Sequence, residues 1–448
     1  MSDTPSPLDL LTDLLARARA KGADAADAVY ARSDSVSHAQ RMGQVEKLER
    51  SESRDLGLRV FLGQKQAVVS SSDIASETLD TMVDRAIAMA RTVPEDPYCG
   101  LADPDQLFSG PVADLDIHDP AEPSAETLIE RARAAEGAAL AVEGVTNSEG
   151  AEADWGSAEI ALAASNGFTG SYRGTRHSVA VSVLAGEGTA MESDYEYSLS
   201  VFGGDLEAPE EIGRKAGEKA VRRLNPQKGP TEQFPVVYDP RVSGGLARHL
   251  AGAINGASIA RGTSLLKDKM GEQVLTKGVS LVDDPHRLRG LRSKPFDAEG
   301  LANGALNLVD DGVLKCWVLD LGAARKLGLT STGRASRGTS SPPSPATTNL
   351  YLTPGTVSPE DLMADIKSGF YVTNLMGMGI NGVTGDYSRG ASGFWIENGE
   401  LTHPVSEMTI AGNLKDMFLN LAPANDLEFR YGVDAPTIRI DGMTVAGT

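Results

Sequence analysis

The chain has 448 residues and is acidic, with a formal net charge of -20 at pH 7, 41% hydrophobic residues and 23% charged residues. This acidity excludes a nucleic-acid partner, because phosphate binding requires a clustered basic surface. We find no apolar run of membrane-spanning length and no basic leader, so we expect a cytoplasmic protein without a membrane partner. The two cysteines, Cys99 and Cys316, are too far apart for a C-x-x-C metal motif or a disulfide framework.

The first 228 residues show the same order of elements twice: a helix, several strands and a second helix. Apolar spacing with Ser or Pro at the start predicts helices over 7–21, 76–92, 124–142 and 209–224. Strand-like runs lie between them at 27–35, 44–53, 56–62, 66–71, 156–165, 169–172, 178–185 and 195–201. We interpret this order as a structural duplication, with one α/β subdomain over 1–110 and a second over 120–228.

The third region, 232–448, is predicted to be a β-rich domain that carries one central helix. Leu246, Leu250, Ala253 and Ile254 have the spacing of a buried helical stripe and predict a helix over 243–257. Glycine-containing turns at 310–312 and 398–399 predict hairpins. The whole chain is therefore predicted to be α+β, with antiparallel and mixed sheets and flanking helices.

Glycines 377, 379 and 382 match the text of the dinucleotide-binding fingerprint, Gly-x-Gly-x-x-Gly. The surrounding sequence argues against that function, because the fingerprint needs a helix directly after the glycines to meet the pyrophosphate. Here the chain continues through further glycines into a strand-like run at 394–397. A glycine-rich β-turn region is the better interpretation.

The six histidines do not form a local metal-binding pattern. None has a second histidine or a cysteine within five positions, and zinc sites usually combine such ligands. His286 follows Asp283 and Asp284, but Asp-Asp-Pro is ordinary turn chemistry. From composition and spacing alone, the chain is an α+β protein without an evident catalytic centre.

Several long stretches resemble the TldD/PmbA family, and in particular its PmbA (TldE) branch. They include ERSESRDLGLRVFLG and SPPSPATTNLYL, and they lie at 49–63, 239–274, 282–300, 341–352, 382–405 and 410–418. The resemblance covers nearly the whole chain from about residue 25. An older label of the family is modulator of DNA gyrase, although the charge of this chain gives no support for DNA contact.

The resemblance implies that this chain lacks the chemistry of its family partner. The TldD subunit resembles a zinc metallopeptidase with an HExxxH helix and a cysteine near its C-terminus, where zinc would activate water. In this chain the matching positions hold Arg248, His249 and Ala253, and no cysteine follows Cys316. We therefore expect no catalytic residue, no metal ligand and no cofactor in this chain, with zinc in a TldD partner.

The first hypothesis is that the chain is a PmbA-like, catalytically silent subunit of a heterodimer with TldD. By resemblance, such pairs cleave unfolded or linear peptides, and an extended peptide can add to a sheet edge. Candidate peptide-groove or vestigial-site residues are Arg248, His249, Arg261, Thr347, Asn349, Gly379 and Gly382. For Thr347, Asn349, Gly379 and Gly382 the alternative interpretation is plain β-turn architecture. For Arg248, His249 and Arg261 it is that their side chains fill the vacated metal site.

Two rival hypotheses stay open at this stage. In one, the chain is itself an active metallopeptidase with unconventional ligands such as His249 or His286. In the other, it is a stand-alone peptide-binding or regulatory protein without a TldD partner. The sequence leaves open a homodimer of the isolated chain, and a chain that is stable only as a homodimer, without affinity for a TldD subunit, would favour the stand-alone protein.

Overall fold

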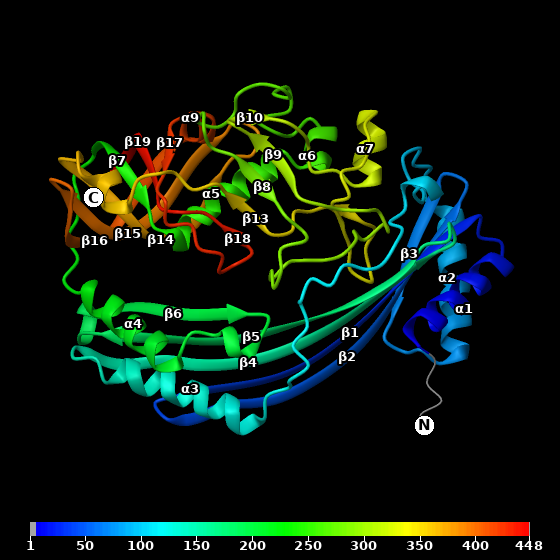
Figure 1. Ribbon diagram of the computed structural model, residues 1–448, viewed down its shortest axis with the longest axis horizontal. Helices are drawn as coiled ribbons and strands as arrows, with labels where there is room; N and C mark the ends of the chain where they lie inside the picture. Colours follow the sequence, from blue (N-terminus) through cyan, green and yellow to red (C-terminus); the bar gives the residue numbers. More distant parts are fainter. Residues whose placement is uncertain (1–5, 448) are drawn as a thin grey trace.

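The computed structural model describes residues 6–447, and its N-terminal half is built on one curved antiparallel sheet (Figure 1). The sheet has six strands in the order β3-β2-β1-β4-β5-β6. The first three strands and their two helices are α1 (Pro7–Ala20), β1 (Ala25–Arg41), β2 (Gln44–Leu62), β3 (Lys65–Ser71) and α2 (Ser76–Thr92). The second set consists of α3 (Ala125–Leu140), β4 (Val145–Ala164), β5 (Thr169–Ala185), β6 (Glu192–Ser200) and α4 (Pro209–Arg222).

The helix–strands–helix order therefore occurs twice, and the predicted α+β class is confirmed. The two sets are joined where β1 pairs with β4, from Asp27 opposite Ala164 to Gln40 opposite Ala151. This pairing makes the two sets parts of a single hydrogen-bonded sheet. The subdomain boundaries at 110 and 120 stay a prediction.

One face of the sheet carries all four of these helices, and the other faces the C-terminal half. Tyr30 of β1 packs in the core under α1 and α2, and Val36 of the same strand packs in the core under α3 and α4. Residues an even number apart on a strand share a face, so both helix pairs cover the same side. Val29, on the opposite side, packs with Phe296 of the C-terminal half. Figure 1 shows that half above the concave side of the sheet.

Strands β2 and β5 are longer than predicted. The separate runs at 44–53 and 56–62 are one strand, and so are those at 169–172 and 178–185. The intervening polar residues and Gly174 weaken the local strand pattern. Pairing with the long neighbouring strands β1 and β4 carries the backbone through these positions, so tertiary hydrogen bonding overrides the local composition.

The C-terminal half contains a mixed sheet that closes on itself. Its strands have the order β16-β15-β14-β7-β19-β17, and β16 also pairs with β19, where Thr409 lies opposite Ala446. β7 and β14 are parallel, and the other pairs are antiparallel. The strands are β7 (Glu232–Tyr238), β14 (Ser368–Ile380), β15 (Asp386–Glu397), β16 (Glu400–Asn413), β17 (Leu421–Pro423) and β19 (Ile438–Ala446).

A second sheet and several short helices complete this half. The sheet has the order β10-β9-β8-β13-β18 and consists of β8 (Leu281–Asp283), β9 (Leu306–Asp310), β10 (Val313–Leu314), β13 (Leu350–Leu352) and β18 (Val433–Asp434). A small ladder joins β11 (Ala335–Ser336) to β12 (Ser344–Pro345). The helices are α5 (Pro240–Ala253), α6 (Gly256–Ala260), α7 (Leu321–Leu327), α8 (Pro359–Met363) and α9 (Leu414–Leu419).

The predicted helix over 243–257 is wrong in its extent, because the chain forms two helices there. α5 begins at Pro240 and ends at Ala253, and α6 begins at Gly256. The Asn255 side chain caps α6 by accepting from the Ala257 N–H, and its Nδ2 donates to the Pro345 carbonyl at 2.9 Å. The Gly256 N–H donates to the Val318 carbonyl at 2.8 Å. These distant partners break the helix.

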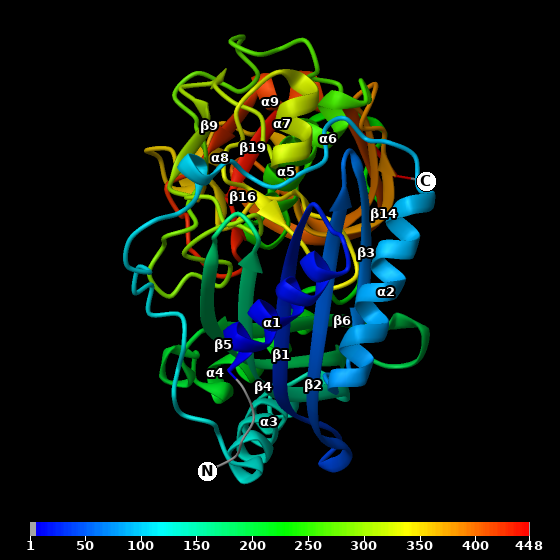
Figure 2. The same ribbon diagram turned by 90° about the vertical axis from the view of Figure 1, so that its right-hand side faces the viewer.

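The two halves are joined by polar contacts at both ends of the curved sheet. Arg325 on α7 donates to the carbonyls of Gly100 at 3.1 Å and Leu101 at 2.6 Å. At the other end, Arg241 on α5 donates to Asp194 on β6 at 2.7 Å. Figure 2, turned by 90°, shows the C-terminal half seated over the strands. No helix within residues 6–447 is long and apolar enough to cross a membrane.

Candidate functional site

Helix α5 lies at the centre of the C-terminal core and presents one polar surface. Its cap is Asp239, whose side chain accepts from the Arg241 N–H at 2.9 Å. Leu246 and Leu250 are buried in the core between the two sheets. The same helical period leaves Arg248 exposed and His249 half-buried, so the two predicted residues lie beside each other at the helix surface.

Positive charge surrounds His249. Its ring lies edge-on to Tyr387, with 6.1 Å between the ring centres. Burial, together with the nearby charges of Arg389 and Arg248, lowers the pKa of His249 to about 4. Burial also lowers the pKa of Arg292, with Arg248 contributing. We call Arg248, His249, Arg292 and Arg389 the α5 cluster.

The α5 cluster does not fit a zinc ion. Zinc sites in proteins need several imidazole, thiolate or carboxylate ligands, and the cluster offers one imidazole among three guanidinium groups. Within residues 6–447 no three His, Cys, Asp or Glu side chains are grouped in a way that could hold a metal ion. The residues present can instead attract anionic or carbonyl groups of a bound chain.

We expect the His249 imidazole to stay neutral at pH 6 and to titrate near pH 4. Replacing Arg389 with glutamine should raise that pKa, because one of the two charges that oppose protonation is removed. Histidine NMR titration of the wild type and the Arg389→Gln variant measures the difference. Arg173→Gln, on a distant exposed strand position, is the control. An unchanged His249 titration in Arg389→Gln would contradict the charge assignment.

Thr347 and Asn349 contact the α5 cluster, because both accept hydrogen bonds from its member Arg292. The Thr347 carbonyl accepts from Arg292 Nη2 at 3.2 Å, and Asn349 Oδ1 accepts from the Arg292 N–H at 3.0 Å. Asn349 is buried, and its Nδ2 donates to the Asp284 carbonyl at 2.7 Å and to Ser293 Oγ at 2.8 Å. Its amide is thus engaged in positioning the segment that carries Thr347.

Gly379 and Gly382 lie on the exposed β14–β15 hairpin. Gly379 pairs with Ser388, and a Cβ at Gly379 would collide with the Ser388 carbonyl, which explains the glycine. The Gly382 carbonyl accepts from the Leu265 N–H at 2.9 Å. The absence of a helix after these glycines agrees with the interpretation that they are not a nucleotide fingerprint. The hairpin also exposes Met378, with 89% of its surface accessible.

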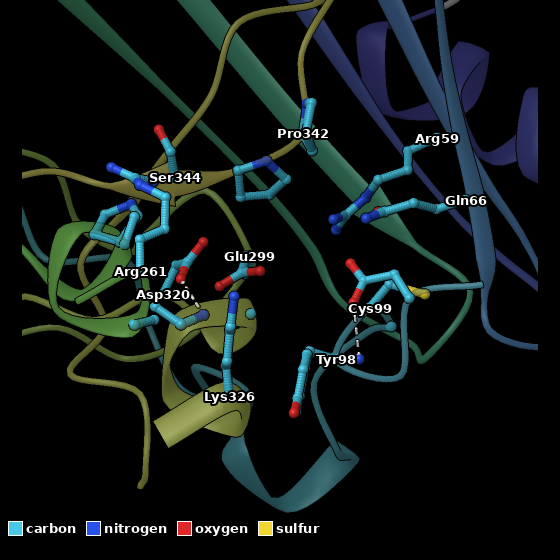
Figure 3. Close-up of a pocket in the computed structure, with 18 residues that line it drawn as sticks. Arg59, Gln66, Tyr98, Cys99, Arg261, Glu299, Asp320, Lys326, Pro342 and Ser344 are labelled. Carbon is cyan, nitrogen blue, oxygen red and sulfur yellow. Dashed lines mark hydrogen bonds between the residues drawn. The ribbon is translucent and has the colours of Figure 1, made fainter. Parts of the chain in front are cut away.

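Arg261 lies apart from the other predicted residues, on a cavity of about 350 Å³ between the two halves (Figure 3). None of the other six candidates lines this cavity. Figure 3 shows Arg59 and Gln66 on one side, with Glu299 and Lys326 between them and Arg261. Burial, together with the charge of Asp297, raises the pKa of the Glu299 carboxyl to about 8. The cavity therefore contains a carboxyl group that favours its neutral form.

Sequence reasoning missed the ion pairs that support this cavity. Asp27 on β1 is buried and accepts from both Arg59 and Arg337. Arg337 is 310 positions away, so no local spacing could connect them. One signal was present: Asp27 interrupts the apolar run AADAVYA, and a buried carboxylate in such a run needs a cationic partner.

The fold and this site together define an α+β protein with a doubled N-terminal sheet, whose central C-terminal helix presents cations at its surface. Three domain profiles match the chain: PmbA/TldA metallopeptidase domain 1 over residues 26–90, the central domain over 118–224 and the C-terminal domain over 231–447. The chain belongs to the PmbA/TldD family.

Curated relatives and solved structures agree with this membership. The chain is 38% identical to the metalloprotease PmbA of Escherichia coli O157:H7, over 95% of this chain and 92% of that protein. It is 37% identical to the metalloprotease PmbA homologue of Haemophilus influenzae, over 95% and 93%. A crystal structure from Bacteroides thetaiotaomicron, described as a candidate modulator of DNA gyrase, is 28% identical and superposes with a TM-score of 0.92 over all of both chains.

Proposed function

We propose that this chain is the non-catalytic, PmbA/TldE-like subunit of a TldD/TldE-type metallopeptidase. The observation that carries the proposal is the α5 cluster. Two guanidinium groups, those of Arg248 and Arg389, act on the single imidazole at the helix surface where the family resemblance locates the zinc motif of TldD, and a third, that of Arg292, lies close to Arg248. A divalent cation is repelled there, so zinc and water activation are assigned to the partner.

The comparisons support a division between two kinds of subunit. Haemophilus influenzae has both a PmbA homologue and a TldD homologue. This chain is 37% identical to the first over 93% of its length, and 27% identical to the second over 56% of its length. We infer that the pair works in the cytoplasm and that this chain takes the PmbA position.

The role of this subunit is to complete the complex and to help hold an unfolded or linear peptide. Arg248 and the Thr347 segment offer charge and backbone groups beside α5, and the β14–β15 hairpin offers an exposed strand edge with Gly379 and Gly382. Main-chain hydrogen bonds to an extended peptide tolerate many sequences. Side-chain identity in the peptide then matters less than its lack of folded structure.

The test compares this chain alone, its TldD-type partner alone and the two mixed. Cleavage of an unfolded test peptide and protein-bound zinc are measured in each sample. We expect peptidase activity in the mixture, with zinc bound only in the samples that contain the partner. Zinc-dependent cleavage by this chain alone would overturn the proposal and favour an active metallopeptidase. Cleavage by the partner that does not change on mixing would favour a stand-alone protein.

A further inference from the structure

The cavity of about 350 Å³ between the two halves has the size of a small-molecule site and carries buried charges of both signs. Ligand pockets in proteins usually have volumes of about 300–1,000 Å³. Arg59 of β2 lines the cavity from the N-terminal half, and Glu299 and Asp320 line it from the C-terminal half. Figure 3 shows Arg59 and Asp320 on opposite sides of the cavity, with Glu299 between them. The cavity therefore has a cationic end and an anionic end.

The Arg59 guanidinium at the cationic end is held along one edge and keeps one nitrogen without a partner. Its side chain is only 5% exposed, and both Nε, at 3.0 Å, and Nη2 donate to Asp27 Oδ2. The Phe61 ring centre lies 4.9 Å from its Cζ. Within residues 6–447 the third nitrogen, Nη1, makes no hydrogen bond. A buried charged donor without an acceptor is costly, so this end favours a ligand carboxylate.

Asp320 at the anionic end is a buried carboxylate without a cation. It is 6% exposed, and its Oδ1 caps α7 by accepting from the Ala323 N–H at 2.7 Å. In the described part of the chain, Oδ2 accepts no hydrogen bond and no lysine or arginine forms an ion pair with it. Buried carboxylates in proteins are normally paired, so this end favours a ligand ammonium group.

Glu299 supplies a neutral donor between the two charged ends. With a pKa of about 8, its carboxyl group keeps a proton at pH 7. Oε2 accepts from the Leu321 N–H at 2.8 Å, which leaves the other oxygen to donate. The charge of Arg59 lowers the pKa of Glu299 and that of Asp320 raises it, so the three groups are close enough to act on one ligand.

These charges select among small ligands. A dicarboxylate or a phosphate dianion would bring a second negative charge toward Asp320. A diamine would bring a second positive charge toward Arg59, and Arg261 and Lys326 line the same cavity. A zwitterion matches both ends. Among zwitterions, a dipeptide also has a peptide carbonyl between its two charges, where the neutral carboxyl group of Glu299 can donate.

We propose that this cavity binds a dipeptide with free termini, its carboxylate at Arg59 and its ammonium group at Asp320. The site is separate from the α5 cluster, because no residue of that cluster lines the cavity. Peptide hydrolysis is the class of reaction that supplies such a ligand. The inference rests on the cavity alone and holds whether or not the chain assembles with a TldD-type subunit, so its failure and the failure of the proposed peptidase role are separate results.

Isothermal titration calorimetry on the full chain at pH 7 tests the proposal with three ligands. They are alanyl-alanine, its N-acetyl derivative, which lacks the ammonium group, and its C-terminal amide, which lacks the carboxylate. Each derivative should bind about tenfold more weakly than alanyl-alanine, because one charged hydrogen bond is lost. The absence of saturable alanyl-alanine binding would overturn the proposal, and so would equal affinities for the three ligands.

The Asp320→Asn variant tests the anionic end. Asparagine can accept from the Ala323 N–H and cap α7, so the variant should fold, which thermal unfolding confirms. Its affinity for alanyl-alanine should fall about tenfold, while its affinity for the N-acetyl derivative should equal that of the wild type. Asp268→Asn removes an exposed carboxylate elsewhere and is the matched control. Equal weakening of both ligands by Asp320→Asn would show that Asp320 only supports the wall of the cavity and would contradict the proposed orientation.

Discussion

Replacing Asp283 with alanine is expected to lower the free energy of unfolding by about 3–5 kcal/mol. Asp283 and Arg334 form an ion pair in which both side chains are completely buried. Removing the carboxylate leaves the guanidinium in the core without a counter-charge. The desolvation cost of that charge is then uncompensated.

The contacts around the pair explain why the loss should be large. The second oxygen of Asp283 accepts from the Thr348 N–H at 2.6 Å and from its hydroxyl at 3.1 Å. Arg334 also donates to the carbonyls of Thr332 at 3.2 Å and Gly333 at 3.3 Å. The pair therefore joins β8 to the segment that carries Thr347, next to the α5 cluster.

Urea unfolding of Asp283→Ala, Arg334→Met and the double variant provides the measurement. The double variant should lose less stability than the sum of the single variants, because it leaves no isolated charge. Asp268→Ala, at an exposed position, is the control and should stay within about 0.5 kcal/mol of the wild type. A loss below about 1 kcal/mol for Asp283→Ala would contradict the expected role of the pair.

Replacing Glu299 with glutamine is expected to stabilise the protein at alkaline pH by roughly 3–4 kcal/mol. Glu299 is 8% exposed, and burial together with the Asp297 charge raises its pKa from 4.5 to about 8. Its Oε2 accepts from the Leu321 N–H at 2.8 Å. A glutamine oxygen can accept the same hydrogen bond without carrying charge.

The direction of the pH effect follows from the raised pKa. Between pH 4.5 and about 8 the folded state keeps a proton on Glu299 that the unfolded state releases. This contribution to stability is complete below pH 4.5 and is lost as the pH rises through 8. Glutamine mimics the protonated form, so the Glu299→Gln variant should lack this loss.

Urea unfolding of the wild type and Glu299→Gln from pH 5 to pH 9 tests this expectation. The difference in unfolding free energy should grow with pH in favour of the variant. Glu272→Gln, at an exposed position, is the control and should give a difference that is small at every pH. A Glu299→Gln difference that does not change with pH would show that Glu299 ionises normally.

Elements with local signals could be predicted from the sequence. Ser124 and Ser358 cap α3 and α8 through their hydroxyls, as Ser at a helix start predicts. Asn398, at a positive φ of 52°, turns β15 into β16. The repeated helix–strands–helix order could be predicted from such signals, because each signal depends on residues that are only a few positions apart.

Features that depend on distant residues could not be predicted. The break between α5 and α6 is set by the Pro345 and Val318 carbonyls, which lie far along the chain. Arg248 and His249 were found through family resemblance, and their arginine neighbour Arg389 comes from a strand that local spacing could not place near α5. Asn349 was predicted as a candidate peptide-groove residue, and its burial among three hydrogen-bond partners could not be derived from local spacing.

The closed sheet of the C-terminal half has a consequence for the order of folding. β19 lies between β7 and β16, so the ring β16-β15-β14-β7-β19 cannot close until residues 438–446 have been synthesised. The N-terminal sheet needs no residue beyond Ser200 for its strand pairing. On the ribosome, that sheet can therefore form during synthesis. β7, the first strand of the closed sheet, can pair with β19 only after about 200 further residues have been synthesised. Such a separation between paired strands slows folding, and assembly of the closed sheet is expected to be the late, rate-limiting event.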